Sequence, residues 1–208
     1  NDIMNKILEI AKKFNISSEP VAYYEHKVGH INSTYFVTCS NGKKYVLQNI
    51  NTSVFKDSDV LMNNIVGVTT HIRQKLKEEG KSSARRTLRF YSVEDGLYYY
   101  KDDRNRYWRL YKFIDNVDCY QSADSTDILE KVGEAFGHFQ MQLADYDATL
   151  LKETIPNFHN TVSRLNDLKT AIDNDIAGRV SSVSDEIQFV LEHSEVCSYI
   201  MDRISNGE

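Results

Sequence analysis

The sequence predicts an α+β fold in which an antiparallel sheet occupies the first half of the chain and helices occupy the second. Between Val21 and Ile114, short segments rich in Val, Tyr, Phe and Thr alternate with turn residues. One segment with a helical period follows the third of these segments, and from Ser125 onward the apolar residues recur only at helical spacing. This change of texture predicts two lobes, 1–114 and 115–208, joined by the polar connector 115–118.

The opening segment is expected to form an amphipathic helix, because its apolar residues recur every three or four positions. They are Ile3, Ile7, Ile10 and Phe14, and Pro20 then breaks the pattern. Three strands are predicted next, Val21–Val28, Thr34–Cys39 and Tyr45–Asn49. Asn41-Gly42 favours a tight hairpin between the last two, since both residues tolerate positive φ.

A second helix is predicted from Asp57 to Glu79, with Asp57 or Ser58 as its cap. One face of it carries Leu61, Ile65, Val68, Ile72 and Leu76. The sheet then resumes with predicted strands Thr87–Tyr91, Gly96–Lys101 and Tyr107–Ile114. Five or six antiparallel strands with one helix inserted after the third is an unusual order, so it is informative about the fold.

The helical half carries three apolar stripes, and each is expected to pack against a core rather than to hold a cofactor. The first stripe is Leu129, Val132, Phe136, Phe139 and Leu143. The second is Val162, Leu165 and Leu168, and the third is Val183, Ile187, Val190, Cys197 and Met201.

Charge and composition exclude several classes of function. The net charge is −5 and the basic residues are scattered, so no nucleic-acid partner is expected. No apolar run approaches the ~20 residues of a membrane span and no signal peptide is present, so no membrane partner is expected. The three cysteines lack metal-binding or paired spacing, which favours the reducing cytoplasm. Because the first residue is Asn1 rather than Met, we expect the chain to be a fragment.

The loop from Gly29 to Thr34 has two interpretations. It is an ordinary hairpin turn, or it is a tight turn whose backbone N–H groups and small hydroxyls approach a phosphate closely. The surrounding order of elements favours the second, because this loop opens a sheet that a helix interrupts after the third strand. An aromatic strand, Tyr107–Ile114, then leads into the helical half, as in the kinase-like two-lobe fold.

Several segments resemble the aminoglycoside phosphotransferase/choline kinase superfamily, and within it most closely the N-acetylhexosamine 1-kinase group. The resembling segments are Gly29–Tyr35, Tyr45–Thr52, Leu61–Ile65, Trp108-Arg109 with Phe113-Ile114, Phe136–Gln140 and Glu153–Thr161. The resemblance covers nearly the whole chain. It implies an antiparallel N-terminal lobe with an inserted helix, followed by a partial helical C-terminal lobe, and it implies ATP and Mg²⁺ as cofactors.

By that resemblance, the loop residues Gly29, His30, Asn32, Ser33 and Thr34 cover the ATP phosphates. The backbone near Phe113, Ile114 and Asp115 meets the adenine.

Gln48 stands where the superfamily usually places a phosphate-anchoring Lys. An amide can hydrogen-bond a phosphate but cannot neutralise its charge. Asn63 and Asn64 stand where a Glu partner on the helix is sought, which is consistent with a polar link in place of the usual ion pair. The alternative is that Gln48 is a strand residue facing solvent.

The loop of Phe158, His159 and Asn160 is placed near the acceptor sugar by the resemblance, where its polar groups would bind hydroxyls or an N-acetyl group. The alternative is that Asn160 caps the following helix and His159 packs beside it. The superfamily also carries a catalytic H-x-D motif and a D-x-D metal motif, yet none of the six histidines is followed by x-D. No catalytic residue or metal ligand is therefore assigned, and the chain alone is expected to be inactive.

The sequence thus predicts part of an ATP-dependent kinase that phosphorylates the anomeric hydroxyl of an N-acetylhexosamine. Two alternatives stay open, a kinase for choline, an amino acid or an aminoglycoside, and a non-catalytic nucleotide- or sugar-binding module. A helix face left exposed in the partial second lobe also predicts a dimer through that surface.

Overall fold

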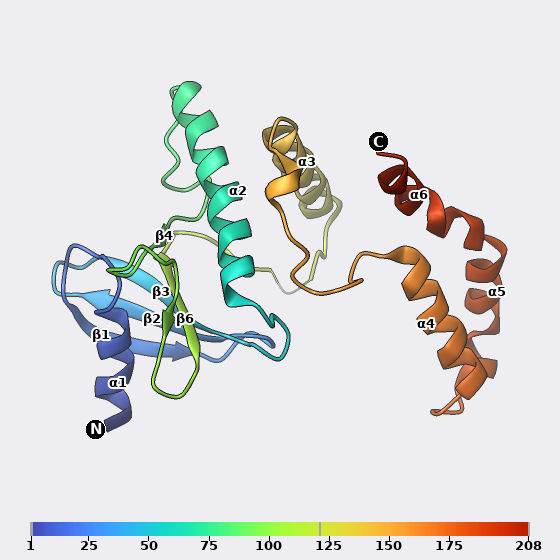
Figure 1. Ribbon diagram of the computed structural model, residues 1–208, viewed down its shortest axis with the longest axis horizontal. Helices are drawn as coiled ribbons and strands as arrows, with labels where there is room; N and C mark the ends of the chain where they lie inside the picture. The colour runs from blue at the N-terminus through green and yellow to red at the C-terminus, as the bar shows by residue number, and fades with distance from the viewer. Residues whose placement is uncertain (1, 121, 208) are drawn as a thin grey trace. The chain divides into compact units, whose positions relative to one another are not determined.

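The computed structural model describes residues 2–120 and 122–207, with side chains from Lys6 onward (Figure 1). Its strands are β1 (Pro20–His26), β2 (Ser33–Cys39), β3 (Lys44–Ile50), β4 (Phe90–Tyr91), β5 (Tyr100–Lys101) and β6 (Tyr107–Lys112). Its α-helices are α1 (Asp2–Ala11), α2 (Ser58–Glu78), α3 (Thr126–Leu143), α4 (Thr161–Asn174), α5 (Ser184–Glu192) and α6 (Tyr199–Ser205). Short 3₁₀ turns lie at Ala148–Leu150, Val180–Val183 and Ser194–Ser198.

The strands form one antiparallel sheet in the order β1-β2-β3-β6-β4, and β5 pairs with β6 (Figure 1). The predicted α+β fold, with one helix inserted after the third strand, is therefore confirmed. The predicted strands Thr87–Tyr91 and Gly96–Lys101 are shortened to β4 and β5. Only the last two residues of each segment pair with β6, since turn and irregular backbone precede β4 at residues 84–89 and precede β5 at residues 94–99, where Gly96 has φ of 82°.

One face of the sheet packs on α1, as the amphipathic period of the opening segment predicts. Strand alternation sends every second side chain to this face. Its buried core comprises Val37, Cys39, Tyr45, Leu47, Trp108 and Leu110 from the strands, with Ile7, Ile10, Ala11 and Phe14. Ile3 of the predicted stripe lies outside the side chains that the structure describes.

The opposite face packs on α2 through a second, smaller core. Ile50 of β3 and Phe90 of β4 meet Leu61 and Met62 of α2 there. Asp57 caps the helix, because its carboxylate accepts hydrogen bonds from the backbone N–H groups of Asp59 and Val60, both at 3.0 Å. Away from this core, the same face of the sheet carries polar and aromatic side chains around Gln48 of β3. They form the candidate site described below.

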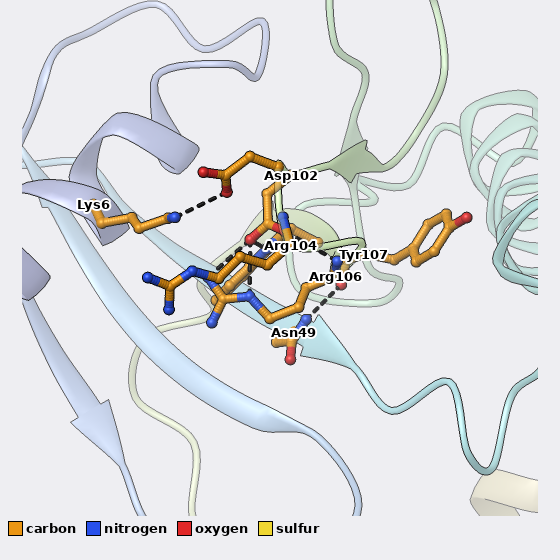
Figure 2. Close-up of polar contacts among 8 residues, drawn as sticks. Lys6, Asn49, Asp102, Arg104, Arg106 and Tyr107 are labelled. Carbon is orange, nitrogen blue, oxygen red and sulfur yellow. Dashed lines mark hydrogen bonds and ion pairs between the residues drawn. The ribbon is translucent and has the colours of Figure 1, made fainter.

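A buried carboxylate fixes the start of β6 (Figure 2). Asp102 Oδ1 accepts hydrogen bonds from the backbone N–H groups of Arg104 (2.9 Å) and Arg106 (3.0 Å). Its Oδ2 accepts from Arg106 Nε (2.8 Å) and from the buried indole Nε1 of Trp108 (3.0 Å). Burial opposes ionisation, but these donors outweigh it and hold the pKa of Asp102 at about 2.

The chain divides into two compact units, residues 1–154 and 155–208. The first extends beyond the sheet because α2 holds the segment after α3. His71 Nε2 and Lys75 Nζ both contact Asp145 Oδ1, and the Asn64 amide exchanges hydrogen bonds with the Lys152 backbone at 2.7 and 3.0 Å. The predicted lobe boundary at residue 114 is a different division, and it stays a prediction.

Four apolar side chains of the α3 stripe, Leu129, Val132, Phe136 and Phe139, are not covered within the first compact unit. The core packing expected of this stripe stays a prediction. The third predicted stripe is broken into α5, a 3₁₀ turn and α6 rather than carried by one helix. A dimer through such exposed surface stays a prediction.

Candidate functional site: a polar strip on the α2 face of the sheet

Three side chains from three adjacent strands form a polar strip on the α2 face. Thr34 of β2 pairs in register with Gln48 of β3, and Gln48 pairs with Arg109 of β6. Gln48 and Ile50 are two residues apart, so they point to the same side of the sheet, towards α2. The strip follows directly from strand register and alternation.

Gln48 connects the other two members of the strip. Its Nε2 donates to Thr34 Oγ1 at 3.1 Å, and its Oε1 accepts from Arg109 Nε at 3.0 Å and Arg109 Nη2 at 2.9 Å. Gln48 is thus partly buried and bonded to its strand neighbours, and its role stays a prediction. The expected link to the helix is wrong, because Asn64 bonds to Lys152 and Asn63 is exposed.

Arg109 is partly buried, and burial lowers its pKa below the ordinary value. A guanidinium nevertheless stays protonated at neutral pH. Its Cζ lies 5.9 Å from the centroid of the Phe90 ring, and Tyr111 beside it has its pKa raised by burial. Arg109 forms no ion pair with any other residue in the described ranges 2–120 and 122–207.

The loop between β1 and β2 leads directly into the strip. Gly29 has φ of 147°, a region that side-chain-bearing residues rarely adopt. His30 and Ser33 are exposed, whereas Thr34 is buried. Asn32 braces the loop against the end of β3, because its Oδ1 accepts from the Asn51 backbone N–H at 2.9 Å. All five predicted loop residues therefore lie between the two strands or at the start of β2.

Aromatic side chains extend the same face towards the end of β6. Phe36 lies two residues from Thr34, and its ring is 5.2 Å from the ring of Phe113 in an edge-on arrangement. The ring of His26 stacks on the ring of Phe36 with 4.9 Å between centroids. The ring of Tyr24 meets the ring of Phe36 edge-on at 5.3 Å. The rings of Phe36 and Phe113 thus form an apolar surface next to the polar strip.

The segment after β6 is fixed by its backbone. Phe113 N–H donates to the Lys44 carbonyl at 3.2 Å, and Ile114 is partly buried. The Arg85 guanidinium donates to the carbonyls of Asp115 and Asn116, the second at 2.9 Å. The Asp115 side chain itself is exposed.

A hollow of about 740 Å³ also touches this segment, but it lies apart from the polar strip. It includes Phe113 and Asp115, and its other walls come from residues such as Asn15 and Tyr45, which belong to the α1 side. The volume therefore does not coincide with the predicted nucleotide residues as a group.

The predicted substrate residues belong to the second compact unit, where they form a helix start. Asn160 caps α4, because its Oδ1 accepts from Ser163 N–H at 3.1 Å. His159 meets Phe158 edge-on at 4.9 Å, and Phe158 is 51% exposed. The capping alternative for Asn160 thus describes its observed contacts, and the substrate role of the three residues stays a prediction.

Replacing Asn160 by Ala is expected to destabilise the first turn of α4 by about 1 kcal/mol, because Ser163 N–H loses its acceptor. Hydrogen exchange at the Ser163 amide measures this. Asn160→Asp is the control that keeps the cap, so exchange should return to the original rate. An unchanged rate in Asn160→Ala would contradict the capping role.

Comparison with known structures identifies the architecture. The chain is similar to the amicoumacin kinase hAmiN in complex with AMP-PNP, Ca²⁺ and Ami, with a TM-score of 0.50 and 16% identity over 82% of this chain and 53% of that chain. The fold is kinase-like. An aminoglycoside phosphotransferase from Alicyclobacillus acidocaldarius subsp. acidocaldarius DSM 446 gives a TM-score of 0.48, with 10% identity over 80% of this chain and 43% of that one. The chain thus spans about half the length of these kinase-like structures. No protein-family model matches the sequence.

Sequence reasoning missed two members of this face of the kinase-like sheet, Arg109 and Phe36. Alternation along β6 does indicate that Arg109 points away from the side of Trp108 and Leu110. Its position beside Gln48 depends on the pairing of two residues that are 61 positions apart in the sequence, which the sequence pattern does not give. Among the residues that the structure describes, no helix is long and apolar enough to cross a membrane.

Proposed function

We propose that this chain is the nucleotide-binding part of an ATP-dependent small-molecule kinase. The observation that carries the proposal is the strip of Thr34, Gln48 and Arg109, which lies beside the Gly29 loop on a kinase-like sheet. Hydrogen-bond donors and a cation on one face suit the phosphates of a nucleotide. The neighbouring rings of Phe36 and Phe113 offer an apolar surface for adenine.

In this proposal the nucleotide lies along the α2 face of the sheet. The backbone of residues 113–115 meets the adenine, and the loop from Gly29 to Thr34 covers the phosphates with Gln48 beneath them. That hAmiN was solved with AMP-PNP and Ca²⁺ supports a nucleotide with a divalent ion.

The described residues do not themselves supply a site for Mg²⁺. Among residues 2–120 and 122–207, no three His, Cys, Asp or Glu side chains are grouped so that they could hold a metal ion.

For the acceptor we propose the anomeric hydroxyl of an N-acetylhexosamine, with Phe158, His159 and Asn160 near the sugar. This rests on the resemblance of the segments Gly29–Tyr35, Tyr45–Thr52 and Glu153–Thr161. Choline, an amino acid or an aminoglycoside is the alternative acceptor. A non-catalytic binding module is the alternative class, and the neutral Gln48 in place of a Lys favours it.

Titration calorimetry of the 208-residue chain with ATP tests the nucleotide site, in parallel runs with and without Mg²⁺. Binding of ATP at micromolar to millimolar concentration, with weaker binding of adenosine, is expected. The proposal would be ruled out if ATP gave neither heat of binding nor thermal stabilisation at concentrations up to 10 mM. That concentration is roughly ten times the upper end of ordinary enzyme KM values.

An acceptor panel tests the reaction in the natural protein that contains this sequence. Phosphorylation of N-acetylglucosamine or N-acetylgalactosamine at the anomeric oxygen, followed by ³¹P NMR, is the expected result. Turnover of choline but of no hexosamine would select the alternative kinase. Nucleotide binding without turnover of any acceptor would select the binding module.

A further inference from the structure

The central residue of the polar strip, Gln48, is neutral and cannot balance the negative charge of nucleotide phosphates. ATP carries several negative charges, and in a kinase site cations beside the phosphates stabilise them. Gln48 can donate a hydrogen bond but has no charge. A cation from another strand is therefore needed on this face, and Arg109 is the one that contacts Gln48.

Gln48 holds the guanidinium of Arg109 in one orientation. Arg109 Nε and Nη2 both donate to the same oxygen, Gln48 Oε1, at 3.0 and 2.9 Å. A guanidinium has five N–H groups in a planar fork. Two are used here, so the remaining N–H groups, including both on Nη1, have no protein acceptor in the part of the chain that the structure describes.

No carboxylate of the described residues forms an ion pair with Arg109. Its contacts are the amide of Gln48, the ring of Phe90 and the neighbouring Tyr111. By contrast, the partly buried Arg106, just before β6, is paired with Asp102 at 2.8 Å. Taking a cation out of water without an opposite charge is costly, so an unpaired Arg in a polar strip points to an anionic ligand.

We propose that Arg109 supplies the positive charge for the nucleotide phosphates, and that Gln48 is its positioning residue. The strip then places the cation on β6 rather than on β3, and the Gln48 amide joins it to Thr34 at the base of the Gly29 loop. This inference rests on the proposed nucleotide site, because the anion is the phosphate chain of ATP.

Arg109→Met tests the charge, with Arg109→Lys and Lys112→Met as companions. Calorimetry of the 208-residue chain should show ATP binding weakened by about 10- to 100-fold in Arg109→Met. Adenosine binding should change by less than about twofold, since adenosine has no phosphate. Arg109→Lys should lie between, because a lysine keeps the charge but lacks the fork that Gln48 orients. Lys112→Met removes an exposed cation from the same strand and should leave both affinities unchanged.

Moving the cation from β6 to β3 gives the second test. In the double variant Gln48→Lys/Arg109→Met, the charge stands on the neighbouring strand of the same strip. ATP binding should recover to within about tenfold of the original affinity, which a purely structural role of Arg109 would not allow. Thermal unfolding of each variant verifies that the first unit is folded.

The outcomes separate this inference from the proposed function. If the unaltered chain binds no ATP, the proposed function fails. If it binds ATP and Arg109→Met binds ATP equally well, the nucleotide site stands and the role of Arg109 is overturned. Equal weakening of ATP and adenosine, or no recovery in a folded double variant, also overturns it.

Discussion

Replacing Asp102 by Ala is expected to lower the free energy of unfolding of the first compact unit by about 3 kcal/mol. The carboxylate is 3% exposed and accepts hydrogen bonds from Arg104, Arg106 and Trp108. Its removal leaves the buried indole N–H without an acceptor and frees the turn that starts β6. Urea unfolding followed by far-UV circular dichroism measures the loss.

Asp103→Ala is the matched control for this prediction. Asp103 is the next residue, and its side chain is 75% exposed with Lys6 as its ion-pair partner at 2.9 Å. An exposed pair of this kind contributes little, so the control should change stability by less than about 1 kcal/mol. Equal losses in the two variants would show that the buried hydrogen bonds are not what fixes the turn.

Asp102 also predicts a dependence of stability on pH. Its pKa is about 2 in the folded chain, below the ordinary value of 3.8. A depressed pKa stabilises the folded state fully above the unfolded pKa, and the stabilisation is lost as pH falls towards the folded pKa. The difference of about 2 kcal/mol between the original chain and Asp102→Asn should therefore shrink between pH 4 and pH 2. A difference that stays constant over that range would contradict the assignment.

Leu47→Ala is expected to cost about 3–5 kcal/mol of unfolding free energy. Leu47 is 0% exposed and lies in the core between β3 and α1, where the neighbouring side chains of the sheet cannot close the space it leaves. Leu97→Ala, at a position that is 43% exposed, is the control and should cost less than about 1 kcal/mol. Urea unfolding compares the two.

The Leu47 variant also separates the two faces of β3. Leu47 faces α1, whereas Gln48 belongs to the polar strip on the opposite face, so the folded fraction of Leu47→Ala should bind ATP with nearly the original affinity. Binding lost in proportion to that of Arg109→Met would contradict this separation of core and site.

How far the sequence predicts the fold differs between its two halves. Alternation and turn residues locate β1 to β3 within one or two residues, and helical period and a capping Asp locate α2. The same period predicts that the stripe on α3 is apolar but not that another element covers it, because burial depends on a partner in space.

The candidate site is predictable only in part for the same reason. The Gly29 loop and Gln48 stand at positions that local pattern and family resemblance can mark. The partner of Gln48 cannot be found locally, since among the described hydrogen bonds Gln48 is joined to Arg109 and not to Asn63 or Asn64, which are nearer in sequence. The partner is set by the register between β3 and β6, which pairs Gln48 with a residue 61 positions later in the sequence.

The place of β6 in the sheet has a consequence for how the molecule forms. The first three strands are joined by short turns and can pair early, whereas β6 must close a long loop before it adds to β3. Until then β3 has an open edge, and Arg109 is absent from the strip. During synthesis on the ribosome, the site therefore cannot assemble before the chain beyond Lys112 has emerged. Under the proposed function, nucleotide binding would then require that β6 has already paired with β3.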